Sequence, residues 1–218
     1  MSGPSCPCCY DVEFDERIAE RDLRAYRRQG PGRTTRALAE ALTAADAHGL
    51  TVLDIGAGIG GLHRLLLDAG AASAVDVDAS APYLAVARRE ADRLDLADRV
   101  QFVHGDFVAS APQVAVADLV GLDRVVCCYP DVDALVGAAA RLTGRRLGIA
   151  VPRDGRFARF AVGAVNLWQR ALGSPLRMHA HDLSRIEAAA GTAGLQLRSV
   201  TRLGFWRVLL FERAQAGG

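Results

Sequence analysis

Short apolar stretches alternate with helix-like stretches along most of this chain, and this alternation limits the possible folds more than any other feature. Apolar runs with the length of buried strands occur at residues 50–56, 73–78, 100–106, 117–123 and 145–152. In the segments between them, apolar residues recur every three or four positions, which is typical of helices. Regular alternation of strands and helices favours a parallel sheet with helices on both faces. We therefore predict a doubly wound, Rossmann-like α/β fold.

The last third of the chain departs from this alternation. Residues 156–172 form an apolar, helix-like segment that interrupts it. Residues 195–204 and 205–213 then have the pattern of two strands joined through Gly204. Neighbouring strands with so short a connection must be antiparallel. We expect a mostly parallel sheet of seven strands that ends in a C-terminal antiparallel hairpin.

The length of 218 residues fits one domain, and half of the residues are hydrophobic, enough for a sizeable core. We assign residues 34–213 to this domain and residues 1–33 to an N-terminal cysteine-rich segment with a cap helix. Within the domain, residues 155–181 are expected to form an inserted substrate cap. Residues 214–218 are a short tail.

Charge and hydropathy restrict the partners. The net charge of +1 gives no basic surface for nucleic acid. No apolar run reaches the roughly 18 residues of a membrane span, and the N-terminus lacks the pattern of a secretory signal. We expect a cytoplasmic protein that acts on a small molecule, without a nucleic-acid partner or a membrane span. Nothing in the sequence sets the oligomeric state.

A glycine-rich stretch after the first strand is the first functional signal. Gly56, Gly58 and Gly61 fit the pattern G-x-G-x-x-G between a strand and a helix, which nicotinamide dinucleotide sites also use. Asp54, two residues before the first glycine, would repel the pyrophosphate of a dinucleotide. The loop suits a cationic ligand such as S-adenosylmethionine, which has an ammonium and a sulfonium group. We also expect Gly60 to contact this ligand.

Two further acids follow at the ends of the next strands. Asp78 closes the second strand, about 20 residues after the loop, where an acid can accept hydrogen bonds from both ribose hydroxyls. We place Asp78 at the ribose in preference to Asp76. Asp106 closes the third strand and can accept a hydrogen bond from the adenine amino group. Each acid alone fits a helix N-cap, but three at consecutive strand ends favour a cofactor site.

These stretches together resemble the motifs of the class I S-adenosylmethionine-dependent methyltransferases. VLDIGAGIG is similar to their first motif, VDASAPYLAVAR to their second stretch and RVQFVHGDF to their adenine stretch. The resemblance covers roughly residues 34–213. It implies a methyltransferase in which Asp78 and Ala79 lie at the ribose of S-adenosylmethionine, and Asp106 and Phe107 flank the adenine.

The fourth strand carries a narrower resemblance. ADLVGLDRVVCCYPD is similar to small-molecule methyltransferases, in particular the magnesium-protoporphyrin O-methyltransferase type. This implies that Leu122 and Asp123 lie beside the methionine end of the cofactor, and that Cys128 and Tyr129 are catalytic. Cys128 stands where those enzymes carry a histidine, which can serve as a general base. The departure puts methylation of a porphyrin carboxylate in question.

The five cysteines form two clusters, Cys6, Cys8 and Cys9 near the start and Cys127 and Cys128 after the fourth strand. In a reducing compartment such clusters suggest metal binding or catalysis rather than disulfides. If the N-terminal segment caps the active site, five thiols converge there and can hold a soft metal, an iron–sulfur cluster or a metalloid. The alternative is a disordered tail and two small buried residues.

The interrupting helix is a candidate wall for an apolar substrate, through Phe157, Phe160, Val165 and Trp168. The alternative is that it packs on the sheet or on another subunit.

An H-x-H pair, His179 and His181, follows the helix. It is either a metal-binding or catalytic pair or a solvated loop before a helix that starts near Asp182.

Together these patterns predict a small-molecule methyltransferase whose acceptor is apolar, a thiol or a metalloid. The alternative is a non-catalytic domain that binds S-adenosylmethionine or a metal for a structural or sensing purpose.

Overall fold

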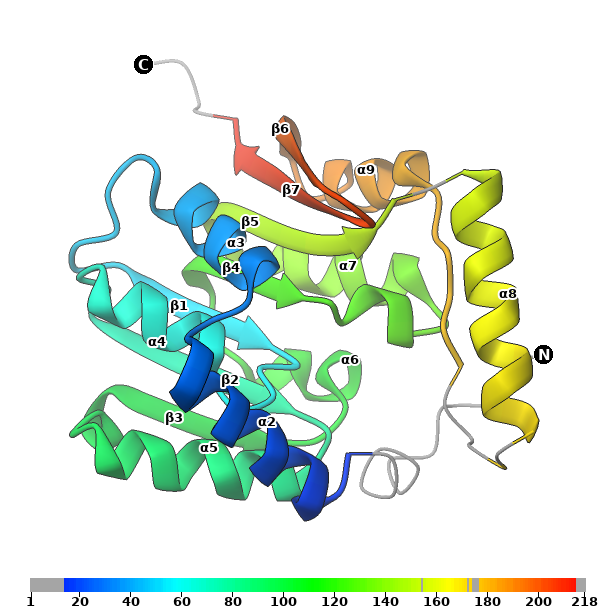
Figure 1. The fold of residues 1–218 in the computed structure, drawn as a ribbon. Coiled ribbons are helices and arrows are strands. Elements are labelled where there is room, and N and C mark those ends of the chain that lie inside the picture. The colour runs from blue at the N-terminus through cyan, green and yellow to red at the C-terminus, as the bar shows by residue number, and fades with distance from the viewer. Residues whose placement is uncertain (1–13, 154, 172, 174–176, 215–218) are drawn as a thin grey trace.

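The computed structural model describes residues 14–153, 155–171, 173 and 177–214. Its strands form one seven-stranded sheet (Figure 1). The strand order is β3–β2–β1–β4–β5–β7–β6, and β7 runs antiparallel between β5 and β6. The strands are β1 (Thr51–Ile55), β2 (Ser73–Asp78), β3 (Val100–His104), β4 (Ala117–Asp123), β5 (Thr143–Pro152), β6 (Leu195–Leu203) and β7 (Trp206–Arg213). The predicted fold class and its closing hairpin are confirmed.

Helices cover both faces of this sheet (Figure 1). One face carries α3 (Arg33–Thr43), α4 (Gly61–Asp68) and α5 (Ala81–Arg93), and the other carries α6 (Phe107–Ser110), α7 (Val132–Arg141) and α9 (Leu183–Gly191). The remaining helices are α2 (Glu16–Gln29), α8 (Arg156–Ala171) and the short 3₁₀ turns η1 (Ala97–Arg99), η2 (Ala111–Gln113) and η3 (Val126–Cys128). Within the described ranges, no helix has the length and apolarity that a membrane crossing requires.

The central strands are buried on both faces, which explains why they occur in the sequence as continuous apolar runs. Close packing of α3 and α4 depends on two glycines that pair across β4 and β5. A Cβ atom at Gly121 would lie 2.3 Å from Leu62, and one at Gly148 would lie 2.6 Å from Leu38. Side chains at these positions would push the helices away from the sheet.

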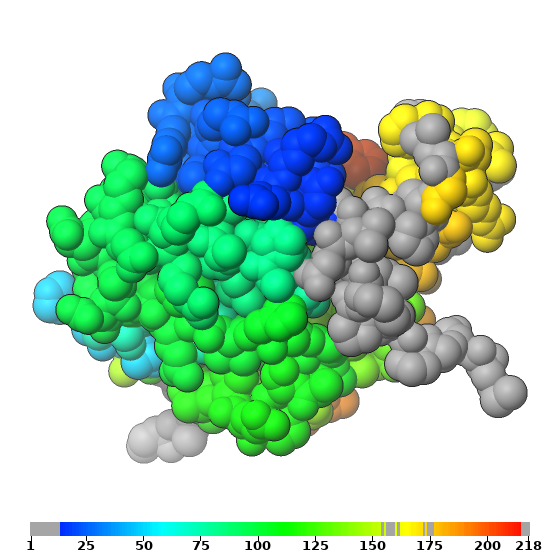
Figure 2. Space-filling view, turned by 90° about the horizontal axis from the view of Figure 1, so that it is seen from below, coloured from blue at the N-terminus to red at the C-terminus, as the bar shows by residue number. Residues whose placement is uncertain are grey.

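A separate attachment holds α2 against α5, and Figure 2 shows the two helices side by side. Ala19 and Leu23 of α2 are buried there. Next to them, the carboxylate of Glu90 on α5 is buried and accepts hydrogen bonds from Arg27 of α2, from Arg64 and from Arg93. These bonds, the one from Arg93 first, lower the pKa of Glu90 to about 2. The ion pairs fix α2 above the strand ends.

Candidate active site

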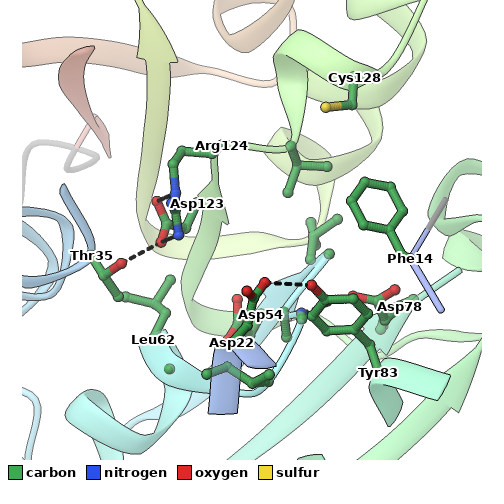
Figure 3. A pocket seen from close by; sticks show the side chains of 18 of the residues that line it. Phe14, Asp22, Thr35, Asp54, Leu62, Asp78, Tyr83, Asp123, Arg124 and Cys128 are labelled. Carbon is green, nitrogen blue, oxygen red and sulfur yellow. Dashed lines mark hydrogen bonds and ion pairs between the residues drawn. The ribbon is translucent and has the colours of Figure 1, made fainter. Parts of the chain in front are cut away.

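A cavity of about 550 Å³ lies at the carboxyl ends of the parallel strands, where α/β folds bind their ligands (Figure 3). Its floor is the loop after β1, and its walls are the ends of β2, β3 and β4. Side chains of α2 and α3 close it from above, among them Asp22, Tyr26 and Thr35. The predicted site residues that line it are Asp54, Gly56, Gly58, Asp78, Ala79, Asp106, Phe107, Asp123, Cys128 and Tyr129.

The glycine loop forms the floor because two of its glycines adopt a left-handed backbone. Gly56 has φ of 63° and Gly58 has φ of 58°. A Cβ atom at Gly56 would also lie 2.6 Å from a methyl group of Val125, so a side chain would force the loop away from the end of β4. Gly60 is not among the lining residues, contrary to its predicted contact with the cofactor. It caps the N-terminus of α4 and faces His63, and Gly61 lines the cavity instead.

Asp54 is the penultimate residue of β1, lines the cavity and is fully buried. Its Oδ2 accepts a hydrogen bond from the backbone N–H of His63 at 3.1 Å and lies 3.0 Å from Nδ1 of that ring. Its Oδ1 has no hydrogen-bond partner among the described residues. A buried, unsatisfied carboxylate oxygen is costly unless a ligand supplies the donor. An ammonium group is well suited to this role.

His63 is a site residue that the sequence analysis missed. It is 1% exposed and fixes Asp54 from the first turn of α4. The available signal was a histidine in the first turn of the helix that follows the glycine loop, since a buried histidine needs a polar partner.

Asp76 lies opposite Asp54 on the neighbouring strand, away from the cavity lining. Neither of its carboxylate oxygens has a hydrogen-bond partner in the described part of the chain. Burial raises the pKa of Asp76 well above its usual range, and the charges of Asp54 and Asp78 add to this effect. Asp76 is therefore a core residue outside the cavity lining, consistent with Asp78 being the predicted ribose ligand.

Asp78 is held rigidly at the end of β2. Its Oδ2 accepts a hydrogen bond from the backbone N–H of Gly58, and its Oδ1 accepts one from Ser80, both at 2.8 Å. Burial raises the pKa of Asp78, and these two amide hydrogen bonds oppose that effect. Each carboxylate oxygen can accept a second hydrogen bond. The group is thus suited to receive two adjacent ligand hydroxyls.

Asp106 combines both roles considered for it, because it lines the cavity and also caps α6. Its Oδ1 accepts hydrogen bonds from the backbone N–H of Val108 at 2.8 Å and from the Tyr129 hydroxyl at 3.2 Å. This bond joins the end of β3 to the segment after η3. Phe107, 5% exposed, presents an apolar surface beside it.

At the end of β4, a further carboxylate lies in the cavity lining. Asp123 Oδ2 accepts a hydrogen bond from the Thr35 hydroxyl at 2.6 Å, and the Arg124 guanidinium lies 3.2 Å from Oδ1 (Figure 3). Arg124 also lines the cavity and has φ of 64°, which is uncommon for a residue other than glycine. Leu122, predicted to lie beside the cofactor, is fully buried in the core instead.

The second cysteine cluster divides between core and cavity. Cys128 lines the cavity, and Cys127 is buried behind it, with 3.8 Å between the two sulfur atoms. The hydrogen bond between the thiols lowers the pKa of Cys128 and raises that of Cys127. The Cys127 sulfur also lies 3.2 Å from the Arg124 carbonyl, so its single S–H can donate either to that oxygen or to Cys128.

The predicted metal centre stays a prediction. Cys6, Cys8 and Cys9 lie outside the described residues, so their convergence on Cys127 and Cys128 is untested. Among the residues that are described, no group of three or more His, Cys, Asp or Glu side chains could hold a metal ion.

The H-x-H segment supports η3 from behind. The backbone N–H of His179 donates to the Cys127 carbonyl at 2.6 Å, and His181 Nε2 lies 3.0 Å from the Tyr129 carbonyl. Burial lowers the pKa of His179, and its proximity to His181 adds to this effect. Asp182 is the N-cap residue of α9, as the sequence indicated. Neither histidine lines the large cavity.

The structure does not bring the candidate apolar wall of α8 to the cavity for the residues that can be assessed. Phe160, Val165 and Trp168 are absent from the cavity lining. Phe160 is 75% exposed and Trp168 is 65% exposed. The side chain of Phe157 lies outside the described part of the structure.

Comparisons with known proteins agree with this geometry. Residues 52–145 match a family model described as a methyltransferase domain. No curated protein matches the chain. The structure of magnesium protoporphyrin IX methyltransferase from Synechocystis PCC 6803 with bound SAM is similar, with a TM-score of 0.67 and 20% identity over 98% of this chain and 100% of that one.

Two larger proteins share the fold as well. An O-methyltransferase family protein from Burkholderia thailandensis has a TM-score of 0.75 and 20% identity, over 95% of this chain and 64% of that one. An O-methyltransferase family 2 protein from Planctomyces limnophilus DSM 3776, in complex with apigenin, has a TM-score of 0.66 and 19% identity, over 91% and 62%. Likenesses at this level of identity establish the fold.

The family match extends from β1 into β5 and so includes the strand ends that carry Asp54, Asp78 and Asp106. Their chemistry fits S-adenosylmethionine, because the free oxygen of Asp54 attracts an ammonium group and repels a pyrophosphate. The match indicates an enzyme rather than a non-catalytic binding domain. By its domain match over residues 52–145, its fold and this site, the chain resembles the class I S-adenosylmethionine-dependent methyltransferases.

Proposed function

We propose that the protein methylates a small molecule held between the cofactor and the corner formed by Arg124, Cys128 and Tyr129. The observation that supports this most is the lining of a single cavity by Asp54, Asp78 and these three residues. A volume of about 550 Å³ lies within the range of roughly 300–1,000 Å³ that holds one drug-sized ligand. After the cofactor is bound, little space remains, which favours a compact acceptor.

In this proposal Asp54 Oδ1 accepts a hydrogen bond from the cofactor's ammonium group, and Asp78 accepts from its ribose hydroxyls. Asp106 and Phe107 border the adenine. When bound, S-adenosylmethionine supplies a methyl group on a sulfonium, which an acceptor attacks in line. The contribution of the chain is to position the reactants and to exclude water with α2 as a roof.

Cys128 is the residue that we assign to proton transfer from the acceptor, with Tyr129 beside it. A cysteine is an adequate base at neutral pH only if its pKa is lowered. The hydrogen bond from Cys127 lowers the pKa of Cys128 in this site. This pairing gives a physical reason for two adjacent cysteines where related enzymes carry one histidine.

The test is an acceptor screen that measures formation of S-adenosylhomocysteine over a range of pH. We expect the rate to rise as the pH passes the pKa of Cys128, and Cys128→Ser to lower kcat by about 10²-fold. Cys127→Ala should move the rise to higher pH, since the lowering hydrogen bond is lost. An unchanged pH profile in both variants would remove the cysteines from catalysis.

A further inference from the structure

Helix α8 carries an apolar stripe that faces away from the molecule. Phe160, Leu167 and Trp168 are 75%, 69% and 65% exposed, more than any other large hydrophobic side chain that the structure describes. Their spacing of seven and eight residues places them on one face of the helix, with the small exposed residues Gly163 and Ala164 between them. This stripe, Phe160–Trp168, is not explained by the cavity.

The opposite face of α8 is attached to the chain. Val162 is 7% exposed, and the Asn166 side chain bonds both the N–H and the carbonyl of Met178 at 2.8 Å. Rotation of α8 that turned the stripe inward would break these bonds and expose Val162. The outward orientation is thus built into the packing of the helix.

The segment that carries the stripe is basic in sequence. Residues 155–181 contain four arginines and no Asp or Glu, although acids make up 25 of the 218 residues of the chain. Arg170, in the last turn of α8, is exposed. A helix with Phe, Leu and Trp on one face, in a segment of net positive charge, is typical of segments that lie in the interface of a membrane.

We propose that α8 docks this protein on an anionic lipid surface. The stripe enters the headgroup layer, Arg170 lies against lipid phosphates, and the net positive charge of the segment favours an anionic surface. A second copy is a poorer occupant, because two segments of the same net positive charge would repel each other. A protein partner is also a poorer fit: a helix of 16 residues is about 24 Å long, so a stripe ~10 Å wide offers about 240 Å². Stable protein interfaces bury about 800 Å² on each partner.

The position of α8 connects this surface to the catalytic edge. The helix follows β5, whose carboxyl end lies at the edge that holds the cavity (Figure 1). The segment after α8 is bonded to η3 through His179 and Cys127, and η3 places Cys128 in the cavity wall. Docking would therefore hold the active-site edge of the sheet near the lipid.

The experiment is co-sedimentation of the full chain with vesicles made of equal parts phosphatidylcholine and phosphatidylglycerol, and with phosphatidylcholine vesicles. We expect binding to the anionic vesicles that weakens as salt is added. The double variant Leu167→Ser, Trp168→Ser should bind at least about tenfold more weakly. Val116→Ser is the matched control, because Val116 is 61% exposed far along the chain from α8, before β4.

A charge variant separates the two contributions. Arg170→Gln should weaken vesicle binding about fivefold, whereas Arg36→Gln, an exposed arginine of α3, should not. Unchanged affinity of every variant for S-adenosylhomocysteine shows that folding is intact. The proposal is overturned if the wild-type chain does not bind anionic vesicles, or if the double variant binds as well as Val116→Ser. A dimer in lipid-free solution that the double variant abolishes, without vesicle binding, would assign the stripe to a second copy.

Discussion

The two sides of the cavity are built differently. On the side of β1, β2 and β3, the carboxylates of Asp54, Asp78 and Asp106 each accept a backbone N–H at 2.8–3.1 Å. We call these three residues the cofactor side. Backbone donors come with the glycine loop and the first turns of helices, so they depend little on which side chains surround them.

On the opposite side, polar groups are held by other side chains. Asp123 is bonded to Thr35 and Arg124, and the pKa of Cys128 depends on Cys127. We call these five residues the acceptor side, and we thereby assign to the acceptor Asp123, which the resemblance placed beside the methionine end of the cofactor. Side-chain contacts change with single substitutions, so this side can vary between enzymes that keep one cofactor. The difference indicates that cofactor affinity and acceptor turnover are separable properties of the chain.

The largest effect is expected on the cofactor side. Asp78→Asn removes the charge and one of the two carboxylate oxygens that now accept backbone N–H groups. We expect affinity for S-adenosylhomocysteine to fall by about 1.5–3 kcal/mol, roughly 10- to 150-fold, measured by calorimetry. Asp76→Asn is the matched control, because that carboxyl lies on the same strand, is buried and is outside the cavity lining. Equal losses in both variants would show that the strand, not the ligand contact, was damaged.

An intermediate effect is expected at the ion pairs of Glu90, which hold α2 over both sides of the cavity. The pKa of Glu90 is lowered to about 2, so its ion pairs stabilise the fold fully above the ordinary glutamate pKa of about 4.5. This contribution, on the order of 2 kcal/mol, is lost as the pH falls from about 4.5 toward 2.

Glu90→Gln should remove that contribution at neutral pH and reduce the fall in unfolding free energy between about pH 4.5 and pH 2. Urea unfolding at pH 7 and at pH 3 checks both parts. If the variant and the wild-type chain lose stability equally between these pH values, other carboxylates cause the loss of stability at acid pH.

The smallest effect is expected on the acceptor side. Thr35→Val removes one hydrogen bond to Asp123, worth about 1 kcal/mol. We expect about a fivefold loss in kcat/KM for the acceptor and no change in affinity for S-adenosylhomocysteine. Thr43→Val on the same helix is the control, since Thr43 bonds only backbone carbonyls of α3 in the described structure. A loss of cofactor affinity in Thr35→Val would contradict the separation of the two sides.

What the sequence could predict follows the same division. Asp54, Asp78 and Asp106 stand at strand ends, and parallel strands bring their carboxyl ends to one edge whatever the side chains are. The contact predicted between Leu122 and the cofactor stays a prediction. Asp123 lines the cavity, whereas the Leu122 side chain is fully buried in the core.

Contacts between side chains far apart in the chain could not be predicted from the sequence. Thr35 and Asp123 are 88 residues apart, and no local pattern announces their hydrogen bond. Helix α8 shows a second limit of prediction from sequence. Apolar residues at helical spacing predict that a face is covered, but they do not say by what, and Phe160 and Trp168 face away from the cavity.

The separation of the two sides is tested most directly by calorimetric titration of S-adenosylhomocysteine into Asp78→Asn, Cys128→Ser and the double variant. We predict that Cys128→Ser keeps the wild-type affinity within about twofold and that the double variant equals Asp78→Asn, because distant, independent sites add. A loss of affinity in Cys128→Ser as large as that in Asp78→Asn would contradict the account.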